Sequence, residues 1–286
     1  MAGRSRHRRA RWQAARADGR RFTVRAAAGG DPFLSEIVPG ELWAKLRRTT
    51  PARIALGRVG HALPLAEVLD FQLAHARARD AVHAALDSAA LAAELAPMPV
   101  LQAESDAPDR ATYLRRPDLG RQLSARSAAL LAEAGGRCDV VFVIGDGLSA
   151  TGVQAGAAQL VRACAAELGG LIIGPVVIAH QARVALGDPI GAALGARVCV
   201  MIIGERPGLS VHDSLGIYMT FAPHPGRTDA ERNCISNIHG AGGLSLQEAA
   251  RTLGWLLREA LRRELSGVAL KDDQTPALPF EDSAPA

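Results

Sequence analysis

The fold is decided by three apolar runs near the middle of the chain, CDVVFVIGDG (138–147), GLIIGPVVIA (170–179) and RVCVMIIG (197–204). Each run is rich in Val and Ile without polar alternation, which is typical of strands buried on both faces of a parallel sheet. The segments between them, residues 151–170 and 187–196, predict a long and a short crossover helix. Repeated strand–helix–strand units predict an α/β fold with a Rossmann-like, doubly wound and mostly parallel sheet.

Helical patterns flank this region on both sides. Residues 39–48 and 64–87 predict helices, and residues 245–267 predict a closing helix whose leucines recur at helical spacing. Residues 215–223 add a candidate strand, and four prolines between residues 95 and 120 place a domain boundary near residue 97. We therefore expect a basic arm (1–30), a helical N-terminal domain (31–97), an α/β domain (98–271) and a tail (272–286), with both ends disordered.

The net charge of +4 is unevenly distributed along the 286 residues. Residues 1–30 hold nine of the 33 basic residues and one of the 29 acidic ones, which leaves 24 basic and 28 acidic residues in the remainder. Two interpretations of the arm stay open, a contact with nucleic acid or another acidic surface and a disordered extension without function. No apolar run reaches the roughly 18 residues of a membrane span, and the arm lacks the apolar region of a secretory signal, so we expect a cytoplasmic protein.

The four cysteines, Cys138, Cys164, Cys199 and Cys234, are widely separated and form no CxxC pair. No histidine stands at metal-ligand spacing from them. We therefore expect neither a disulfide framework nor a metal site.

Three loops with polar or glycine residues follow the predicted strands, namely residues 145–152, 180–184 and 204–210. Ligands of open α/β sheets bind at the carboxyl ends of the strands, so these loops predict a binding site. The first loop has GxG without the third glycine of a dinucleotide motif. It also has Val153 and Gln154 where a phosphate-binding loop needs Lys and Ser or Thr. These departures argue against a nucleotide ligand.

Several residues in these loops and in residues 234–243 can be interpreted in two ways. Asp146 can orient a ligand or cap the turn after its strand, and His239 can act as a base or cap a turn. The GERPG segment (204–208) can be a structural turn or a site, and Cys234 taken alone is a packing residue. No Ser/His/Asp or Cys/His grouping is specific enough to predict a hydrolase.

Five motifs together resemble the small (light) subunit of ethanolamine ammonia-lyase. They are LRRTTPARIALGRVG (46–60), YLRRPDLGRQL (113–123), DGLS (146–149), IGERPGLSVHDSLGIYM (203–219) and CISNIHGAGG (234–243). The resemblance extends from Asp31 to Lys271. It implies a subunit that pairs with a separate large subunit, a (β/α)₈ barrel, in a hetero-oligomeric enzyme that uses adenosylcobalamin to convert ethanolamine to acetaldehyde and ammonia by a radical mechanism.

The resemblance also implies what this subunit contributes. It would close the cobalamin site against the large subunit, with cofactor contacts at Val184, Glu205 and Cys234 and no catalytic residue of its own. Cys234 is assigned by its own motif, since one residue is missing between it and Glu205 relative to the family. The chain lacks the D-x-H-x-x-G motif of proteins that supply a histidine to cobalt, so we expect adenosylcobalamin in its base-on form and no metal ligand here.

The competing interpretation is a stand-alone nucleotide- or nucleic-acid-binding α/β protein that uses the basic arm. The failed phosphate motifs argue against it, and we expect neither a nucleic acid nor a membrane as a partner. For location the resemblance implies the cytoplasm, with enclosure in a bacterial microcompartment as the alternative.

Overall fold

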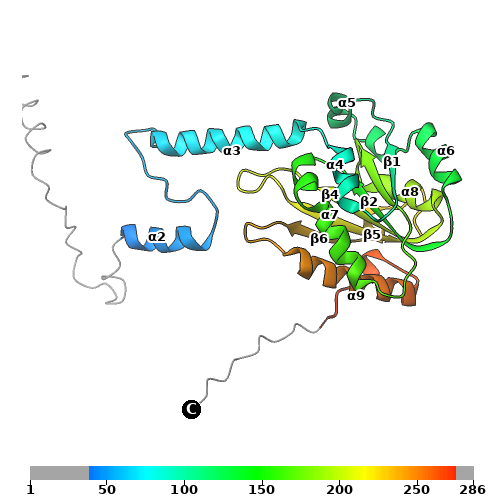
Figure 1. Cartoon of the computed structure of the whole chain (residues 1–286). Helices are drawn as coiled ribbons and strands as arrows, with labels where there is room; N and C mark the ends of the chain where they lie inside the picture. Colours follow the sequence, from blue (N-terminus) through cyan, green and yellow to red (C-terminus); the bar gives the residue numbers. More distant parts are fainter. Residues whose placement is uncertain (1–38, 275–286) are drawn as a thin grey trace, which may run out of the picture. The chain divides into compact units, whose positions relative to one another are not determined.

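The computed structural model describes residues 39–274, shown as the coloured ribbon in Figure 1. The chain divides into two compact units between Leu56 and Gly57. In the first unit the described residues form helix α2 (Pro39–Thr49), close to the expected helix at 39–48. The second unit contains every other helix and strand described below. The expected arm, residues 1–30, lies outside the described residues, as does the tail from residue 275.

The second unit is built around one sheet of six strands in the order β1-β3-β2-β4-β5-β6 (Figure 1). The strands are β1 (Val100–Glu104), β2 (Cys138–Gly145), β3 (Val176–His180), β4 (Ala196–Gly204), β5 (Leu215–Phe221) and β6 (Arg232–Ile238). Strands β1 to β4 pair in parallel, whereas β5 pairs antiparallel with both β4 and β6. The α/β class is confirmed. The sheet is mixed, so the expected Rossmann-like, doubly wound arrangement is not confirmed.

Helices of the second unit cover both faces of the sheet. They are α3 (Leu65–His83), α4 (Ser88–Leu95), α5 (Arg110–Arg115), α6 (Ala125–Glu133), α7 (Ala150–Glu167), α8 (Gly187–Ala193) and α9 (Leu246–Arg263). Side chains define their starts: Ser149 caps α7, and Ser245 with Glu248 forms a capping box at α9. Helices α4, α7 and α9 contribute to the core on one face, and α6 and α8 contribute to the core on the other.

Strand β2 shows why its sequence is apolar without interruption. Val140, Phe142 and Ile144 lie in the core shared with α7 and α9, and Val141 and Val143 lie in the core shared with α6 and α8. Successive side chains of a strand point to opposite faces, so a strand covered on both faces buries every residue. All five of these side chains are fully buried. The segments that follow such strands therefore start from a well-packed end of the sheet.

Two features of the fold differ from the expected organisation. Helix α4 buries Leu91 and Leu95 in the same core as the sheet, and the observed division at residue 56 does not coincide with the boundary expected near residue 97. That boundary stays a prediction. Strand β6 was not among the strands expected from the sequence, and Cys234 lies on it.

Candidate functional site

A cavity of about 370 Å³ lies where strands β2 and β4 end, and we call it the strand-end cavity. Its lining comes from helix α5, strands β4 and β5 and the segments that follow β2, β3 and β4. It consists of Tyr113, Gly147, Leu148, Arg183, Val184, Ile203, Gly204, Glu205, Arg206 and Tyr218. Two of the three expected site residues, Val184 and Glu205, therefore line the same cavity. The site is at the carboxyl ends of parallel strands, as the loop pattern predicts.

Asp146 holds the loop that carries Val184. Its two carboxylate oxygens accept hydrogen bonds from the backbone N–H groups of Gln181 and Ala182, each at 2.9 Å. Arg110 lies 3.6 Å from the same carboxylate. Burial raises the pKa of Asp146, while these hydrogen bonds and Arg110 act in the opposite direction. Of the two readings of Asp146, the structure favours the one that caps a turn.

The YLRRPDLG motif holds the same loop from the other side. The Tyr113 hydroxyl donates to the carbonyl oxygen of Ala182 at 3.0 Å, and the backbone N–H of Arg183 donates to the carbonyl oxygen of Gly120 at 2.8 Å. A Cβ atom at Gly120 would lie 2.9 Å from Cγ of Arg183, so the close approach requires glycine. Burial raises the pKa of Tyr113 to about 12, which keeps the hydroxyl as a donor. The motif thus positions Val184 although it lies far away in the sequence.

Glu205 is fixed by contacts with two later segments. Its Oε2 accepts from the Ser214 hydroxyl at 2.6 Å and from the backbone N–H of Asn237 at 3.3 Å. The turn itself is closed by a hydrogen bond from Gly208 N–H to the carbonyl oxygen of Val211 at 2.7 Å. The GERPG segment is therefore a structural turn, and the same turn places Glu205 and Arg206 in the cavity wall.

Cys234 lies beside the cavity and does not line it. It is paired with Tyr218 across β5 and β6, and Tyr218 is a lining residue. Desolvation raises the pKa of the Cys234 thiol, and the negative charge of Glu205 raises it further, against a hydrogen bond from Tyr218. The thiol is protonated near neutral pH, which suits a polar contact surface and does not suit a nucleophile.

The β5–β6 end of this sheet face is open. Helix α8 packs chiefly against β4 and β2, while Cys234 on β6 is exposed and Tyr218 on β5 is only half-buried. A partly exposed strand surface therefore continues from the strand-end cavity toward the sheet edge. Such a surface can receive a broad, flat molecule.

A family model described as "Ethanolamine ammonia-lyase light chain (EutC)" matches residues 40–271. The chain belongs to this light-chain family. The match includes every residue of the strand-end cavity as well as Cys234.

Curated relatives agree with this family. The ethanolamine ammonia-lyase small subunit of Bradyrhizobium diazoefficiens is 57% identical over 248 residues, which cover 85% of this chain and 95% of the relative. The small subunit of Rhodopseudomonas palustris is 58% identical over 233 residues, or 80% and 89% of the two chains. That of Xanthomonas campestris is 52% identical over 255 residues, or 86% and 93%.

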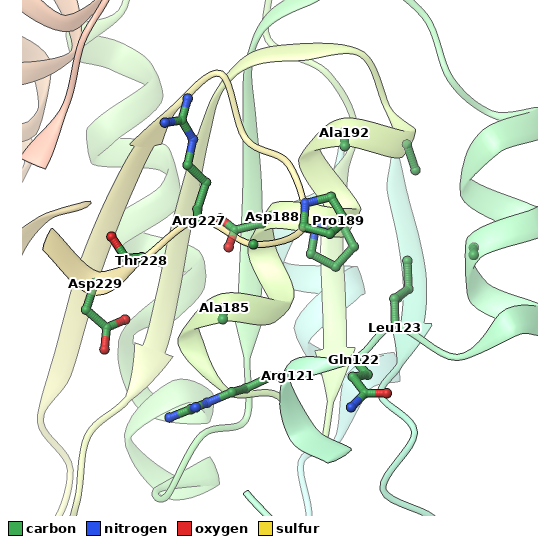
Figure 2. Close-up of a pocket in the computed structure, with 14 residues that line it drawn as sticks. Arg121, Gln122, Leu123, Ala185, Asp188, Pro189, Ala192, Arg227, Thr228 and Asp229 are labelled. Atoms are coloured by element: carbon green, nitrogen blue, oxygen red, sulfur yellow. The ribbon is translucent and has the colours of Figure 1, made fainter. Parts of the chain in front are cut away.

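A larger cavity of about 730 Å³ lies over helix α8, and no sequence pattern had indicated it (Figure 2). We call it the α8 cavity, and its wall includes Arg121, Ala185, Pro189, Ala192 and Thr228. Of its four charged residues, Asp188 and Asp229 pair with Arg232, Arg227 pairs with Glu231, and Arg121 is exposed. The cavity holds none of the expected cofactor contacts, and its paired charges offer no acid or base for chemistry.

The remaining candidate groups are engaged in local structure. One ring nitrogen of His239 contacts Asn237 Oδ1 at 2.8 Å, and the other accepts from the backbone N–H of Ala241 at 3.2 Å, so the turn-capping reading of His239 is favoured. Within residues 39–274 no group of three or more His, Cys, Asp and Glu side chains is arranged to hold a metal ion. In the same residues no helix has the length and hydrophobicity needed to cross a membrane.

Proposed function

We propose that the chain is the cobalamin-closing subunit of an ethanolamine ammonia-lyase, and that Val184, Glu205 and Cys234 contact the cofactor. The observation that carries this proposal is spatial. Val184 and Glu205 line one cavity, and Cys234 is paired with the cavity residue Tyr218. The three residues come from separate segments and were assigned by motif alone, so their grouping at one sheet edge is independent support.

The chemistry of the residues fits a corrin cofactor. A corrin is a broad disc fringed with amide groups, so its binding surface needs hydrogen-bond acceptors, donors and flat apolar area. Glu205 uses only part of its acceptor capacity on Ser214 and Asn237, which leaves lone pairs for an amide N–H. Val184 would supply apolar contact, and Cys234 with Tyr218 would support the disc on the open strands. When bound, base-on adenosylcobalamin would supply the radical chemistry of the reaction.

This subunit's own role would be to bind, orient and exclude water. Hydrogen bonds fix the carboxylates in and beside the strand-end cavity. Asp146 accepts from two backbone N–H groups, and Glu205 accepts from the Ser214 hydroxyl and the backbone N–H of Asn237. Such fixed groups lower the ordering cost of cofactor binding. Closure over the cofactor would keep water from the reactive centre, which has chemical value without a catalytic residue.

The proposed partner is a large subunit, because the relatives are named small subunits. Helix α3 offers a surface for such a partner. Leu65, Leu69 and Leu73 recur every fourth residue, and their exposed fractions are 71%, 54% and 50%. An apolar stripe of this kind is a common mark of a protein interface. An obligate interface would bury more than the roughly 1,600 Å² of a standard complex.

The test is to purify the chain alone and together with its large subunit, and to add adenosylcobalamin and ethanolamine anaerobically in the dark. We expect acetaldehyde only from the pair. Steady turnover by the chain alone would refute the closing role. A purified pair that binds no cobalamin and produces no acetaldehyde would refute the proposed function itself.

A further inference from the structure

Arg183 stands in the wall of the strand-end cavity in a fixed position. Its guanidinium lies 4.3 Å from the centre of the Tyr113 ring, and Nη2 donates to the carbonyl oxygen of Tyr113 at 3.2 Å. Its backbone is tied to Gly120, which leaves no room for a Cβ atom beside the arginine side chain. Several contacts therefore hold the Arg183 guanidinium in this position.

The guanidinium has no anion of its own. Among the described residues no carboxylate oxygen lies within 4.0 Å of it, and its buried Nε has no hydrogen-bond partner. Arg110 and Arg232, which are half-buried and buried, each have a carboxylate partner. Arg110 lies 3.6 Å from Asp146, and Arg232 is paired with Asp188 at 2.6 Å. A partly desolvated cation that lacks a counter-charge destabilises the free chain. The presence of this cation in the cavity wall points to a bound anion.

The other charged groups of the cavity do not fill this role. Glu205 accepts hydrogen bonds from Ser214 and Asn237 and is directed to those groups. Arg206 adds a second positive charge, but its side chain is exposed, so water screens it. The cavity therefore presents two cations and one carboxylate, with the stacked Arg183 as the less hydrated cation.

We propose that Arg183 binds the phosphodiester of the cobalamin nucleotide tail. This inference rests on the proposed function, because it assumes that the cavity receives cobalamin. The corrin fringe consists of neutral amides, and the phosphodiester is the anionic group of the tail. A guanidinium offers two parallel N–H donors to such a group, and stacking on an aromatic ring preorganises it. Arg183 is adjacent to Val184, so the tail would leave the corrin on that side.

The experiment compares two ligands in the assembled two-subunit complex. Cobalamin carries the phosphodiester, whereas cobinamide has the same corrin without the nucleotide tail. Dissociation constants of both are measured from the change in corrin absorbance, for the wild-type complex and for Arg183→Gln. Arg126→Gln is the matched control, since it removes an exposed arginine of α6 that lines neither cavity. Co-purification with the large subunit and circular dichroism check that each variant folds and assembles.

We expect Arg183→Gln to weaken cobalamin binding by about 10- to 100-fold, the effect of one charged hydrogen bond, and to leave cobinamide binding unchanged. We expect Arg126→Gln to retain the wild-type affinities. Equal losses for both ligands would place Arg183 on the corrin or in the scaffold and overturn the inference. Unchanged cobalamin binding would also overturn it, in favour of an acidic group of the large subunit as the counter-charge.

Two further outcomes separate this inference from the proposed function. A wild-type complex that binds neither ligand contradicts the proposed function, and the inference falls with it. Should the wild type bind cobalamin but not cobinamide, the salt dependence of cobalamin binding decides instead. An ionic contact is screened by salt, so the affinity of the wild type should fall with NaCl more steeply than that of Arg183→Gln. Equal slopes would overturn the inference.

Discussion

At the scale of single residues, neighbours in the sequence have different roles at the strand-end cavity. Glu205 is held by a serine hydroxyl and a backbone N–H, while Arg206 extends into solvent. Arg183 is stacked on Tyr113, while Val184 offers an apolar surface. The two residues of each pair are consecutive in the sequence. Their side chains differ in environment because different segments pack against them.

Glu205→Gln tests the residue with the clearest proposed contact. Glutamine keeps one oxygen for Ser214 but presents an NH₂ group where the second carboxylate oxygen accepted. We expect cobalamin affinity in the assembled enzyme to fall by on the order of 1.5 to 3 kcal/mol, with turnover at saturating cofactor little changed. Titration of cofactor against activity measures both, and Glu94→Gln on the exposed surface of α4 is the control. Turnover that collapses at unchanged affinity would show that the role is wrong.

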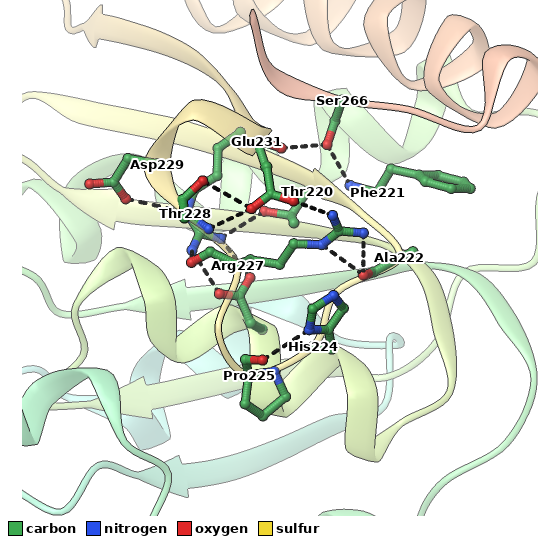
Figure 3. Close-up of polar contacts among 12 residues, drawn as sticks. Thr220, Phe221, Ala222, His224, Pro225, Arg227, Thr228, Asp229, Glu231 and Ser266 are labelled. Atoms are coloured by element: carbon green, nitrogen blue, oxygen red, sulfur yellow. Dashed lines mark hydrogen bonds and ion pairs between the residues drawn. The ribbon is translucent and has the colours of Figure 1, made fainter. Parts of the chain in front are cut away.

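At the scale of elements, many polar contacts hold the β5–β6 connection (Figure 3). Thr228 and Glu231 form a capping box around the short helix η3 (Asp229–Glu231), and Arg227 pairs with Glu231. Arg232 at the start of β6 reaches across to Asp188 in α8 with two bonds of 2.6 and 2.7 Å. These contacts fix the two antiparallel strands on which Tyr218 and Cys234 lie.

The capping box gives stability a dependence on pH. Hydrogen bonds from Thr228 and Arg227 lower the pKa of Glu231 from 4.5 to about 2. Because the folded pKa is depressed, this contribution is complete above about pH 5 and is lost as the pH falls toward 2. We expect Glu231→Gln to lower the thermal midpoint at pH 6 to 7, with the difference from wild type shrinking toward pH 2. Glu133→Gln, on the exposed end of α6, is the control; a difference that is constant over this range would contradict the assignment.

The Arg232–Asp188 pair should contribute more than surface pairs. Both side chains are nearly fully buried, at 2% and 3% exposure. Arg232→Met leaves Asp188 uncompensated, so we expect a loss of about 3 to 5 kcal/mol in the free energy of unfolding, measured in urea. Arg197→Met breaks the exposed pair with Asp139 and should cost about 0 to 1 kcal/mol. Equal effects of the two substitutions would mean that the buried pair has no special weight.

At the scale of the whole molecule, the family match and the expected function concern the same residues. The match spans residues 40–271, and the helices and strands described here lie almost entirely within that range. The arm with its nine arginines lies outside it. We therefore expect whatever the arm contributes to be separate from the function that the matched residues share.

Deletion of residues 1–30 tests this separation. We expect the turnover of the reconstituted two-subunit enzyme to change by less than about tenfold, or roughly 1.4 kcal/mol in activation free energy. Solubility or location is free to change, because the arm is strongly positive, whereas the rest of the chain has more acidic than basic residues. Acetaldehyde production by the pair is the measurement. A larger loss would show that the arm takes part in assembly or catalysis.

The sequence by itself determined the elements whose burial is complete. The runs at β2, β3 and β4 predicted strands because every residue of a doubly covered strand is apolar, and α7 and α9 followed from helical spacing. The motifs also led to the family and to Val184, Glu205 and Cys234 as candidate contacts. Strand β1 was not predicted because it is only five residues long and mostly half-exposed. Strand β6 was missed because polar residues interrupt its buried positions.

Only the tertiary structure decided which strands pair and which loops meet. The antiparallel pairing of β5 with β4 and β6 depends on partners distant in the sequence, so apolar runs alone indicated a more parallel sheet. The contact of Tyr113 and Gly120 with Arg183 is likewise invisible in the sequence, because some sixty to seventy residues separate the partners. Periodicity reports local burial, whereas a site is made by non-local pairing.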